Sequence, residues 1–324
     1  MTRVAAIDCG TNSVRLLVAD VDSGHPPEPP ASPRKLTDVV RTMEIVRLGQ
    51  GVDRTGRLAA DALGRTFAVL RRYADLIAGS GVSATRMIAT SATRDASNAR
   101  DFTEGVRDVL GIEPEVISGE EEAALSFAGA TAELARTGPA GPYLVVDIGG
   151  GSTEFVLGEG AAEHVAASVS VDIGCVRMTE RHLRSDPPAP GEIATATADI
   201  EAALDVVALK VPVGSAATLV GLAGSVTTVA GIALGLREYD ARAIHHSRIP
   251  ADQVHAVSRS LLGQSHAQRA AIGIMHPGRV DVIGAGALIL DRVMARFGFR
   301  DVVVSEHDIL DGIAWQLASP QDRG

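Results

Sequence analysis

The chain has 324 residues, of which 46% are hydrophobic, 22% are charged and only 3% are aromatic. This balance excludes collagen-like, disordered and small disulfide-rich classes, and the length is enough for roughly two domains with buried cores. Acidic residues outnumber basic residues by 40 to 30, which gives a net charge of −10, and only two residues are lysines. An overall negative field argues against binding to nucleic acid or to an anionic membrane, although local arginines can still hold phosphate.

The cysteines and the first residues of the chain indicate its surroundings. Cys9 and Cys175 lie far apart and form no CxxC or Cys/His spacing, so the sequence predicts neither a disulfide nor a zinc site. The N-terminal residues enter a strand-like pattern at once, without a signal peptide. Residues 211–236 carry no charge but are interrupted by Gly and Pro, which favours a buried strand–loop–helix unit over a membrane span. We therefore expect a cytoplasmic protein.

The first part of the chain predicts an α/β domain with a mixed sheet. Short apolar runs bounded by turn residues indicate strands, and Leu63, Phe67 and Leu70 recur at helical spacing. The Pro-rich segment 22–35 predicts an exposed loop. In chain order we expect strands at 3–8, 14–21 and 39–48, a helix at 63–77, a strand at 86–90, a helix at 99–110 and a strand at 115–117.

The second part of the chain opens in the same way. Each part begins with an apolar strand, an Asp-x-Gly turn and a second strand, which indicates a duplicated fold with two halves. The expected strands are 143–148, 153–157, 218–223 and 301–304, and the expected helices are 193–209, 252–262, 280–297 and 308–317.

Two glycine-bearing turns, Asp8–Ser13 and Asp147–Thr153, are candidates for phosphate binding. Glycine lets backbone N–H groups converge on an anion, and a leading Asp at the end of a strand can hold Mg²⁺ through water. Each turn alone is also compatible with an ordinary hairpin, but two copies favour phosphate. Neither fits a P-loop or a dinucleotide fingerprint. The candidate phosphate contacts in the turns are Gly10, Thr11, Asn12, Ser13, Gly149, Gly150, Gly151, Ser152 and Thr153.

Three consecutive glutamates, 120–122, follow Ser118 and Gly119. Ser118 and Glu121 have the spacing of a capping box, and all three charges suit the start of a helix. The functional alternative makes one carboxylate a general base that orients water toward phosphorus. The two interpretations are compatible with each other.

Four further residues have both a functional and an ordinary interpretation. Glu154 follows Asp147 by seven residues and is either a partner of that carboxylate or a solvated strand residue. Arg94, with Asn98 nearby, can bind phosphate bidentately or lie on the surface. Ser225 opens a helix after a small-residue turn, where it either contacts an anion or caps the helix.

The nine histidines form no recognisable metal-binding motif, and there is no GxSxG motif.

Taken together, several segments resemble the exopolyphosphatase/guanosine pentaphosphate phosphohydrolase family of the actin-like ATPase superfamily. The matching stretches are AAIDCGTNSVRLLVAD, RLGQGVD, IATSATRDASN, VISGEEEAALSFAG, VVDIGGGSTEF, DIGCVRMTE, GLAGSVTTVAGIALGL and GRVDVIGAGALIL, which run in order from residue 5 to residue 290. The resemblance implies two actin-like (ribonuclease H-like) α/β domains with a cleft between them. We expect the first domain to span residues 1–125 and to be completed by 300–324, and the second to span 126–299.

The same resemblance implies a function and a site. It implies a phosphoanhydride hydrolase that removes terminal phosphate from polyphosphate or guanosine pentaphosphate with Mg²⁺ or Mn²⁺, together with a monovalent cation such as K⁺, and acts as a homodimer. Glu121 falls on the catalytic glutamate, while Asp147 and Glu154 fall on acidic positions that place metal and water. Asp8 is a further metal contact through water. Arg94, Asn98 and Ser225 complete the expected phosphate contacts.

Two departures and two other functions are also part of this interpretation. Family members often continue the last strand as Ser-x-x-Gly-Leu-Arg, whereas Ser305 is followed here by Glu-His-Asp-Ile-Leu-Asp-Gly. Longer members carry additional helical domains, so we expect a preference for short polyphosphate. A small-molecule kinase of the same superfamily would share both turns, and a non-catalytic sensor would bind guanosine tetra- or pentaphosphate without turnover.

Overall fold

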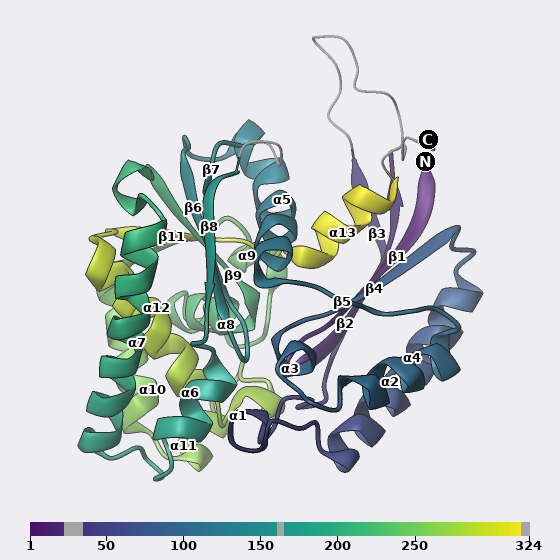
Figure 1. Cartoon of the computed structure of the whole chain (residues 1–324). Helices are drawn as coiled ribbons and strands as arrows, with labels where there is room; N and C mark the ends of the chain where they lie inside the picture. Colours follow the sequence, from purple (N-terminus) through teal and green to yellow (C-terminus); the bar gives the residue numbers. More distant parts are fainter. Residues whose placement is uncertain (23–34, 161–164, 319–324) are drawn as a thin grey trace. The chain divides into compact units, whose positions relative to one another are not determined.

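The computed structural model describes residues 1–22, 35–160 and 165–318 (Figure 1). The chain divides into two compact units, residues 1–118 with 309–324, and residues 119–308. These boundaries differ from those expected at 125/126 and 299/300. The segments in question belong to the second unit because the helix that begins at Gly119 packs on its sheet and the strand Asp301–Val304 pairs within that sheet. The Pro-rich segment lies outside the described residues except at its ends.

The first unit contains a five-stranded mixed sheet in the order β3-β2-β1-β4-β5. Strands β1 to β3 pair antiparallel, while β4 and β5 extend the sheet in parallel from β1. Its strands are β1 (Thr2–Cys9), β2 (Ser13–Val21), β3 (Leu36–Ile45), β4 (Ala84–Ala89) and β5 (Glu115–Val116). Its helices are α1 (Val52–Thr55), α2 (Ala60–Gly79), α3 (Ser91–Arg94), α4 (Ala99–Leu110) and α13 (Ile309–Ala318).

Strand β1 is apolar from Val4 to Ile7 because helices cover both of its faces. Ala5, Ile7 and Cys9 point to the side where α2 and α4 pack, and they join a core that includes Phe102. The alternate residues face the opposite side, where α13 contacts β1, β2 and β4. Helix α13 therefore covers the second face of the first sheet, although it follows the whole second unit in the chain.

The second unit repeats this topology and adds one strand. Its order is β8-β7-β6-β9-β11-β10, so β6 takes the central position that β1 has in the first sheet. Its strands are β6 (Tyr143–Ile148), β7 (Thr153–Gly158), β8 (Val165–Val171), β9 (Thr218–Leu222), β10 (Arg248–Pro250) and β11 (Asp301–Val304). Its helices are α5 (Gly119–Thr137), α6 (Cys175–His182), α7 (Pro190–Lys210), α8 (Ala223–Ala233), α9 (Ala241–Ile244), α10 (Ala251–Gly263), α11 (His266–Ala270) and α12 (Ile283–Phe297).

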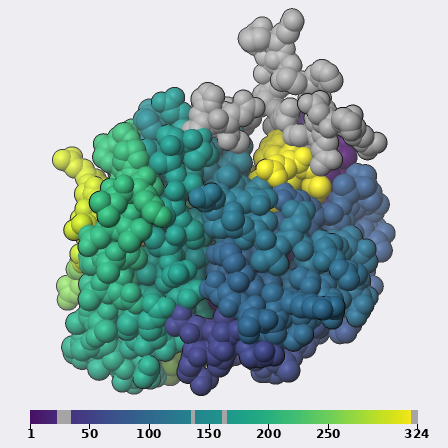
Figure 2. Space-filling model, in the orientation of Figure 1, coloured from purple at the N-terminus to yellow at the C-terminus, as the bar shows by residue number. Residues whose placement is uncertain are grey.

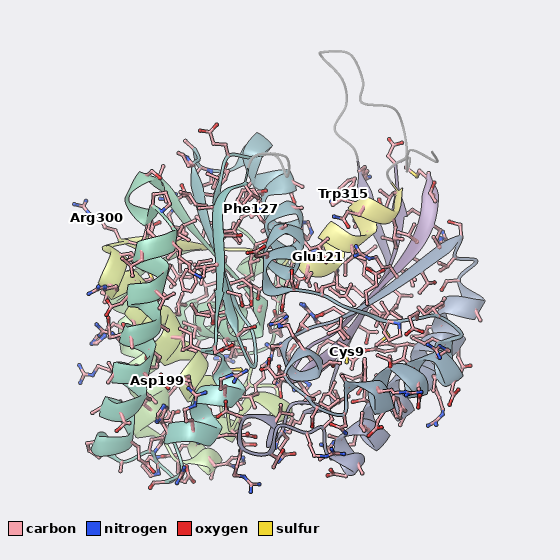
Figure 3. All side chains as sticks on the ribbon, viewed as in Figure 1. Cys9, Glu121, Phe127, Asp199, Arg300 and Trp315 are labelled. Carbon is pink, nitrogen blue, oxygen red and sulfur yellow. The ribbon has the colours of Figure 1, made fainter. Side chains whose placement is uncertain are left out.

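Alternation along β6 separates the two faces of the second sheet. Leu144 and Val146 pack against the helical layer that contains α7, α8, α10 and α12. Tyr143 and Val145 face the other side, where α5 packs, and Phe127 of α5 lies in this smaller core (Figure 3). The apolar residues of α5 recur at Ala123, Phe127, Ala130 and Leu134, a spacing that gives the helix one sheet-facing stripe. Figure 2 shows the same view in space-filling form, coloured by residue number.

The predicted fold class is confirmed: the chain forms an α/β fold with two mixed sheets of ribonuclease H-like strand order. All predicted strands and helices are present, with bounds shifted by a few residues. The sequence did not predict the strands β8 and β10, the helix α6 or the short helices α1, α3, α9 and α11. Both cysteines are free and buried. In the described part of the chain, no helix has the length and apolar character that a membrane span requires.

A buried ion pair fastens α13 to the first sheet and gives a first prediction. The Arg41 guanidinium on β3 donates two hydrogen bonds to the Asp311 carboxylate, at 2.6 and 3.2 Å, and the Asp311 side chain is 3% exposed. Asp311→Asn removes the charge from this contact, so the free energy of unfolding of the first unit should fall by about 1–3 kcal/mol. Urea denaturation followed by the fluorescence of Trp315, the chain's one tryptophan and a residue of α13, measures this change.

Asp38→Asn is the matched control, because Asp38 binds the same Arg41 but its side chain is 42% exposed. This control should cost less than about 1 kcal/mol. An equal loss in the two variants would contradict the account of α13 docking.

Candidate active site

The hairpins that open the two units have the same register but carry different charges. In the second unit, Asp147 on β6 lies directly opposite Glu154 on β7. In the first unit, Asp8 on β1 lies opposite Arg15 on β2. Directly opposed residues have Cβ atoms about 4.5–5.5 Å apart. The second hairpin therefore places two carboxylates side by side, whereas the first places a carboxylate beside a guanidinium.

Both carboxylates of the second hairpin are buried, and each accepts a hydrogen bond from a serine. Asp147 is 8% exposed and Glu154 is 1% exposed. The hydroxyl of Ser126 on α5 lies 2.7 Å from Asp147 Oδ2, and the hydroxyl of Ser170 on β8 lies 2.7 Å from Glu154 Oε1. Strand alternation puts both carboxylates on the face that α5 covers. Buried anions need such partners, because an ionised carboxylate without them is expensive to remove from water.

The glycine turn between β6 and β7 is held from behind by the start of α6. The N–H groups of Cys175 and Val176 donate to the carbonyls of Gly149 and Gly150, at 3.0 and 2.9 Å. A trans peptide points its N–H opposite to its C=O, so the N–H groups of Gly150 and Gly151 point away from α6. They donate no hydrogen bond to the described residues. Two free amides in adjacent positions form a small anion-binding concavity.

Gly174 makes this arrangement possible by close backbone approach. A Cβ at this position would lie 2.4 Å from the carbonyl carbon and oxygen of Gly150 and 2.6 Å from the nitrogen of Gly151. The Arg177 guanidinium adds a hydrogen bond of 2.7 Å to the Gly151 carbonyl. The turn is therefore clamped by main-chain and side-chain contacts rather than left to its own preference.

Helix α5 begins beside these groups in the same unit and carries Glu121 in its first turn (Figure 3). Glu121 is exposed, whereas Glu122 is 9% exposed. Ser126 lies one turn after Glu122, so the face of α5 that carries Glu122 and Ser126 points toward Asp147. Gly119, the first residue of α5, packs closely against Ser170 of β8, because a Cβ on Gly119 would lie 2.5 Å from the Cβ of Ser170. The exposed Glu121 carboxylate can reach solvent at the same end of the helix.

The first-unit turn has the same backbone architecture. Gly10 N–H donates to the Ser13 carbonyl at 3.0 Å, as Gly149 N–H does to Ser152 at 3.1 Å. The carbonyl of Asn12 accepts hydrogen bonds from the N–H groups of Val46 and Arg47, and the carbonyl of Thr11 accepts one from Gly49. Asp8 is 4% exposed, and Arg15 donates two hydrogen bonds to its Oδ2, at 2.9 and 2.7 Å. This ion pair neutralises Asp8 locally.

The remaining predicted phosphate contacts are placed differently. Arg94 ends α3, and its guanidinium donates a hydrogen bond of 3.0 Å to the Ile117 carbonyl. Asn98 is buried, and its amide bonds both the N–H and the carbonyl of Leu58, so it holds the backbone together. Ser225 is buried at the start of α8, where a Cβ on Gly286 would lie 2.2 Å from its hydroxyl.

The second unit therefore brings together Glu121, Asp147, Glu154 and the turn Gly149–Thr153. Asp8, Gly10–Ser13, Arg94 and Asn98 belong to the first unit, and Ser225 lies after β9 in the second. The sequence missed Ser126, Ser170 and the α6 residues that hold the turn. The segment DIGCVRMTE, which contains the start of α6, is one of the stretches that resemble the family. Its hydrophobic pattern does not show that its backbone N–H groups bind a distant turn.

Two other features of the second unit lie away from these residues. Glu133, His245 and His307 offer one donor atom each within 4.8 Å of one another. The Glu306 N–H donates to His245 Nδ1 at 3.1 Å, which places the imidazole proton on Nε2, beside Glu133 Oε2 at 3.3 Å. A metal-binding Nε2 must be unprotonated, so this geometry defines a hydrogen-bonded network rather than a metal site.

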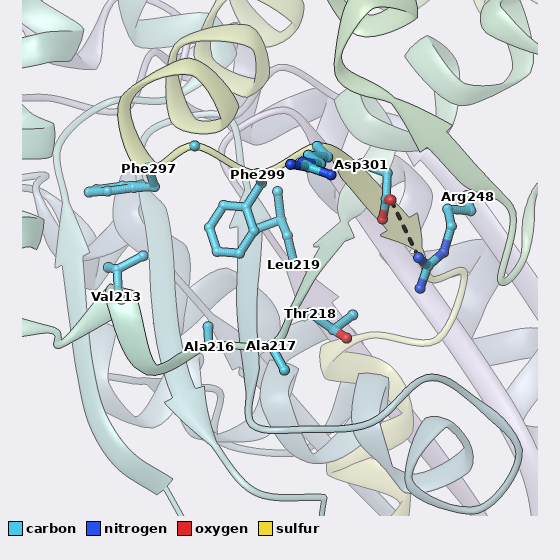
Figure 4. Close-up of a pocket in the computed structure, with 12 residues that line it drawn as sticks. Val213, Ala216, Ala217, Thr218, Leu219, Arg248, Phe297, Phe299 and Asp301 are labelled. Carbon is cyan, nitrogen blue, oxygen red and sulfur yellow. Dashed lines mark hydrogen bonds and ion pairs between the residues drawn. The ribbon is translucent and has the colours of Figure 1, made fainter.

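The second feature is a pocket of about 400 Å³ at the amino-terminal ends of β9 and β11 (Figure 4). Phe297, Phe299 and Leu219 line it, and an Arg248–Asp301 ion pair of 3.3 Å lies at its rim. Because β6 and β9 are parallel, the glycine turn lies at the other end of these strands. The pocket is therefore separate from the acidic pair.

Comparison with known proteins agrees with this arrangement. The model of the Ppx/GppA phosphatase family matches residues 17–319. Exopolyphosphatase 2 of Mycobacterium tuberculosis is 50% identical over 327 residues, which cover 98% of this chain and 99% of that protein. A crystal structure of an exopolyphosphatase-like protein has a TM-score of 0.91 at 41% identity, covering 98% of this chain and 99% of the other. The Aquifex aeolicus PPX-GPPA enzyme has a TM-score of 0.78 at 31% identity, covering 97% and 99%.

The family match and the 50% identity to an exopolyphosphatase indicate a phosphoanhydride hydrolase. The chain belongs to the Ppx/GppA phosphatase family. The resemblance inferred from the sequence is confirmed.

The close approach at Gly174 gives a second prediction. Its φ and ψ of −143° and 162° are extended values that alanine adopts freely, so Gly174→Ala acts only by pushing the Gly150–Gly151 backbone away. Displacements of about 1 Å in positioning groups can cost 100-fold in rate. We expect a loss of phosphate-release activity of about that size, with little change in circular dichroism.

Gly191→Ala in α7 is the control, because an added Cβ there meets nothing within 4 Å. It should keep full activity. Full activity in Gly174→Ala as well would show that the turn does not hold the substrate.

Proposed function

We propose that the protein is a Mg²⁺-dependent exopolyphosphatase that hydrolyses the terminal phosphoanhydride of inorganic polyphosphate and releases orthophosphate. The observation that carries the proposal is the second-unit hairpin, where two free turn amides lie beside two buried carboxylates. The 50% identity to a protein named Exopolyphosphatase 2 supports polyphosphate as the substrate class.

The turn binds the anion in this proposal. The N–H groups of Gly150 and Gly151 point away from α6, so they can donate to oxygens of the terminal phosphate. Backbone amides carry no net charge, which suits a chain whose overall charge is −10. The phosphate contacts expected of Arg94 and of the Gly10–Ser13 turn in the first unit remain predictions of the sequence.

Asp147 and Glu154 fit a divalent cation. Mg²⁺ commonly binds through one or two carboxylates together with waters and substrate phosphates, and Mn²⁺ accepts the same donors. Asp8 is a weaker candidate because Arg15 already binds its carboxylate. A cation held at Asp147 and Glu154 would offset the negative charge that builds up on the phosphate oxygens. A monovalent cation such as K⁺ remains a prediction of the sequence resemblance alone.

Glu121 is the proposed general base. Its carboxylate is exposed at the start of α5, so it can accept a proton from a water molecule. The water oxygen forms a bond to the terminal phosphorus as the bridging P–O bond breaks in line. The products are orthophosphate and a polyphosphate shortened by one unit. The turn amides stabilise the charge that is spread over the equatorial oxygens during this step.

Guanosine pentaphosphate is the alternative substrate, which the resemblance of the sequence implies. The replacement of the usual Gly-Leu-Arg after Ser305 removes one cation that could select between them. Binding of guanosine tetra- or pentaphosphate without turnover and phosphate transfer to an acceptor are the further alternatives. The homodimer and the cytoplasmic location also remain predictions.

The third prediction is tested by phosphate release from polyphosphates of graded length and from guanosine pentaphosphate, assayed side by side with Mg²⁺. We expect release from polyphosphate, loss of release with a chelator and recovery when Mg²⁺ is added back. Glu121→Gln should lower the rate by about 10²–10⁴-fold, the usual contribution of a general base.

Glu120→Gln is the matched control, because Glu120 is an exposed neighbour in the same helical turn. It should retain its rate, with circular dichroism unchanged in both variants. Full activity of Glu121→Gln would overturn the assignment of the base. Release from guanosine pentaphosphate alone, or acceptor-dependent ADP formation from ATP, would overturn the assignment of the substrate.

A further inference from the structure

We propose that Ser126 is a positioning residue that orients the Asp147 carboxylate toward the divalent cation, an inference that rests on the proposed function. Ser126 is fully buried, and its hydroxyl donates to Asp147 Oδ2 at 2.7 Å. A hydroxyl bound to one carboxylate oxygen fixes the rotation of the carboxylate and leaves the other oxygen with a set direction. Partners of this kind around a metal ligand commonly change metal affinity by 10–100-fold.

The direction of the Ser126 hydroxyl distinguishes it from other hydroxyls in helices of this chain. Serine and threonine in a helix usually return their hydroxyl to the carbonyl one turn earlier. Thr131 in α5 does so with Phe127, Thr66 in α2 does so with Ala62, and Thr228 in α8 does so with Gly224. The Ser126 hydroxyl instead reaches from the helix to a strand residue 21 positions away. Helix geometry alone does not demand this contact.

The register of the hairpin explains why such a contact is needed. Asp147 and Glu154 are directly opposed like charges, an arrangement that destabilises a strand pair. The equivalent pair in the first unit is Asp8 with Arg15, which is an ion pair and holds itself in place. The second hairpin lacks this cross-strand attraction. Hydroxyl donors on the two neighbouring elements, α5 and β8, bind the two carboxylates.

Ser126 and Ser170 divide this task, but Ser126 gives the sharper test. Ser170 is only half-buried and packs against Gly119, so its replacement would also disturb the start of α5, which carries Glu121. Ser126 is enclosed between α5 and the sheet and lies more than one turn beyond Glu121. Removing its hydroxyl oxygen changes little besides the contact with Asp147.

The fourth prediction compares Ser126→Ala with the wild-type protein in Mn²⁺ binding, measured by electron paramagnetic resonance without substrate. We expect the Mn²⁺ dissociation constant to rise by about 10–100-fold. The Mg²⁺ concentration for half-maximal phosphate release should rise in parallel, while kcat at saturating Mg²⁺ stays within about threefold of wild type. A purely structural role would lower kcat or thermal stability without shifting the metal dependence.

Two controls make the outcome decisive. Thr131→Ala removes a buried hydroxyl from the same helix that binds only the Phe127 carbonyl among the contacts described, and it should leave Mn²⁺ affinity unchanged. In an Asp147→Asn background, Ser126→Ala should cause no further loss, because the two residues act through one contact.

The possible failures are distinguishable. If wild type binds Mn²⁺ through Asp147 and Ser126→Ala binds it within twofold, the positioning role is overturned while the proposed function stands. If Asp147→Asn leaves Mn²⁺ binding unchanged, the metal site itself is wrong and the inference falls with it.

Discussion

The direct opposition of Asp147 and Glu154 across the β6–β7 hairpin is the constraint on which the rest of the second unit depends. Two buried carboxylates at neighbouring positions repel one another, so they need hydrogen-bond donors around them. Helix α5 and strand β8 supply serine hydroxyls, and the start of α6 fixes the turn so that its free amides point away from the body of the unit. In the proposed function, this pair of carboxylates would hold the Mg²⁺ that accompanies the phosphate substrate.

The two units use one backbone design for different chemistry. In each unit a central strand ends in an Asp, turns through glycine and returns antiparallel, and a later segment of the same unit bonds the turn carbonyls from behind. The partner of the Asp differs: it is Arg15 in the first unit and Glu154 in the second. An ion pair occupies the first hairpin, whereas the second hairpin brings two carboxylates together, which is the donor set that we propose for the metal ion. A duplicated fold can thus assign separate tasks to equivalent positions.

The sequence predicted the parts of this arrangement that depend on local pattern. A few consecutive residues are enough to recognise each of these patterns. They are the apolar runs of β1 and β6, the helical spacing in α2 and the two Asp-x-Gly turns. The sequence could not predict that the Asn98 amide forms hydrogen bonds with the Leu58 backbone, or that the Ser126 hydroxyl donates to Asp147. These contacts depend on how distant segments pack. Strand β8 was missed because its residues are mostly small and only partly buried, which gives a weak alternating pattern. The cluster of Glu133, His245 and His307 could not be predicted either, because it also depends on tertiary packing. The two histidines are 62 residues apart in the chain.

The central claim is that the second hairpin, and not the first, holds the divalent cation for hydrolysis. Mn²⁺ binding to Asp8→Asn and Asp147→Asn tests it most directly, because each change removes one charge from an equivalent position and preserves the shape of the side chain. The account predicts that Asp147→Asn loses the tightest Mn²⁺ site while Asp8→Asn retains it. Loss of that site in Asp8→Asn, with wild-type affinity in Asp147→Asn, would contradict the account.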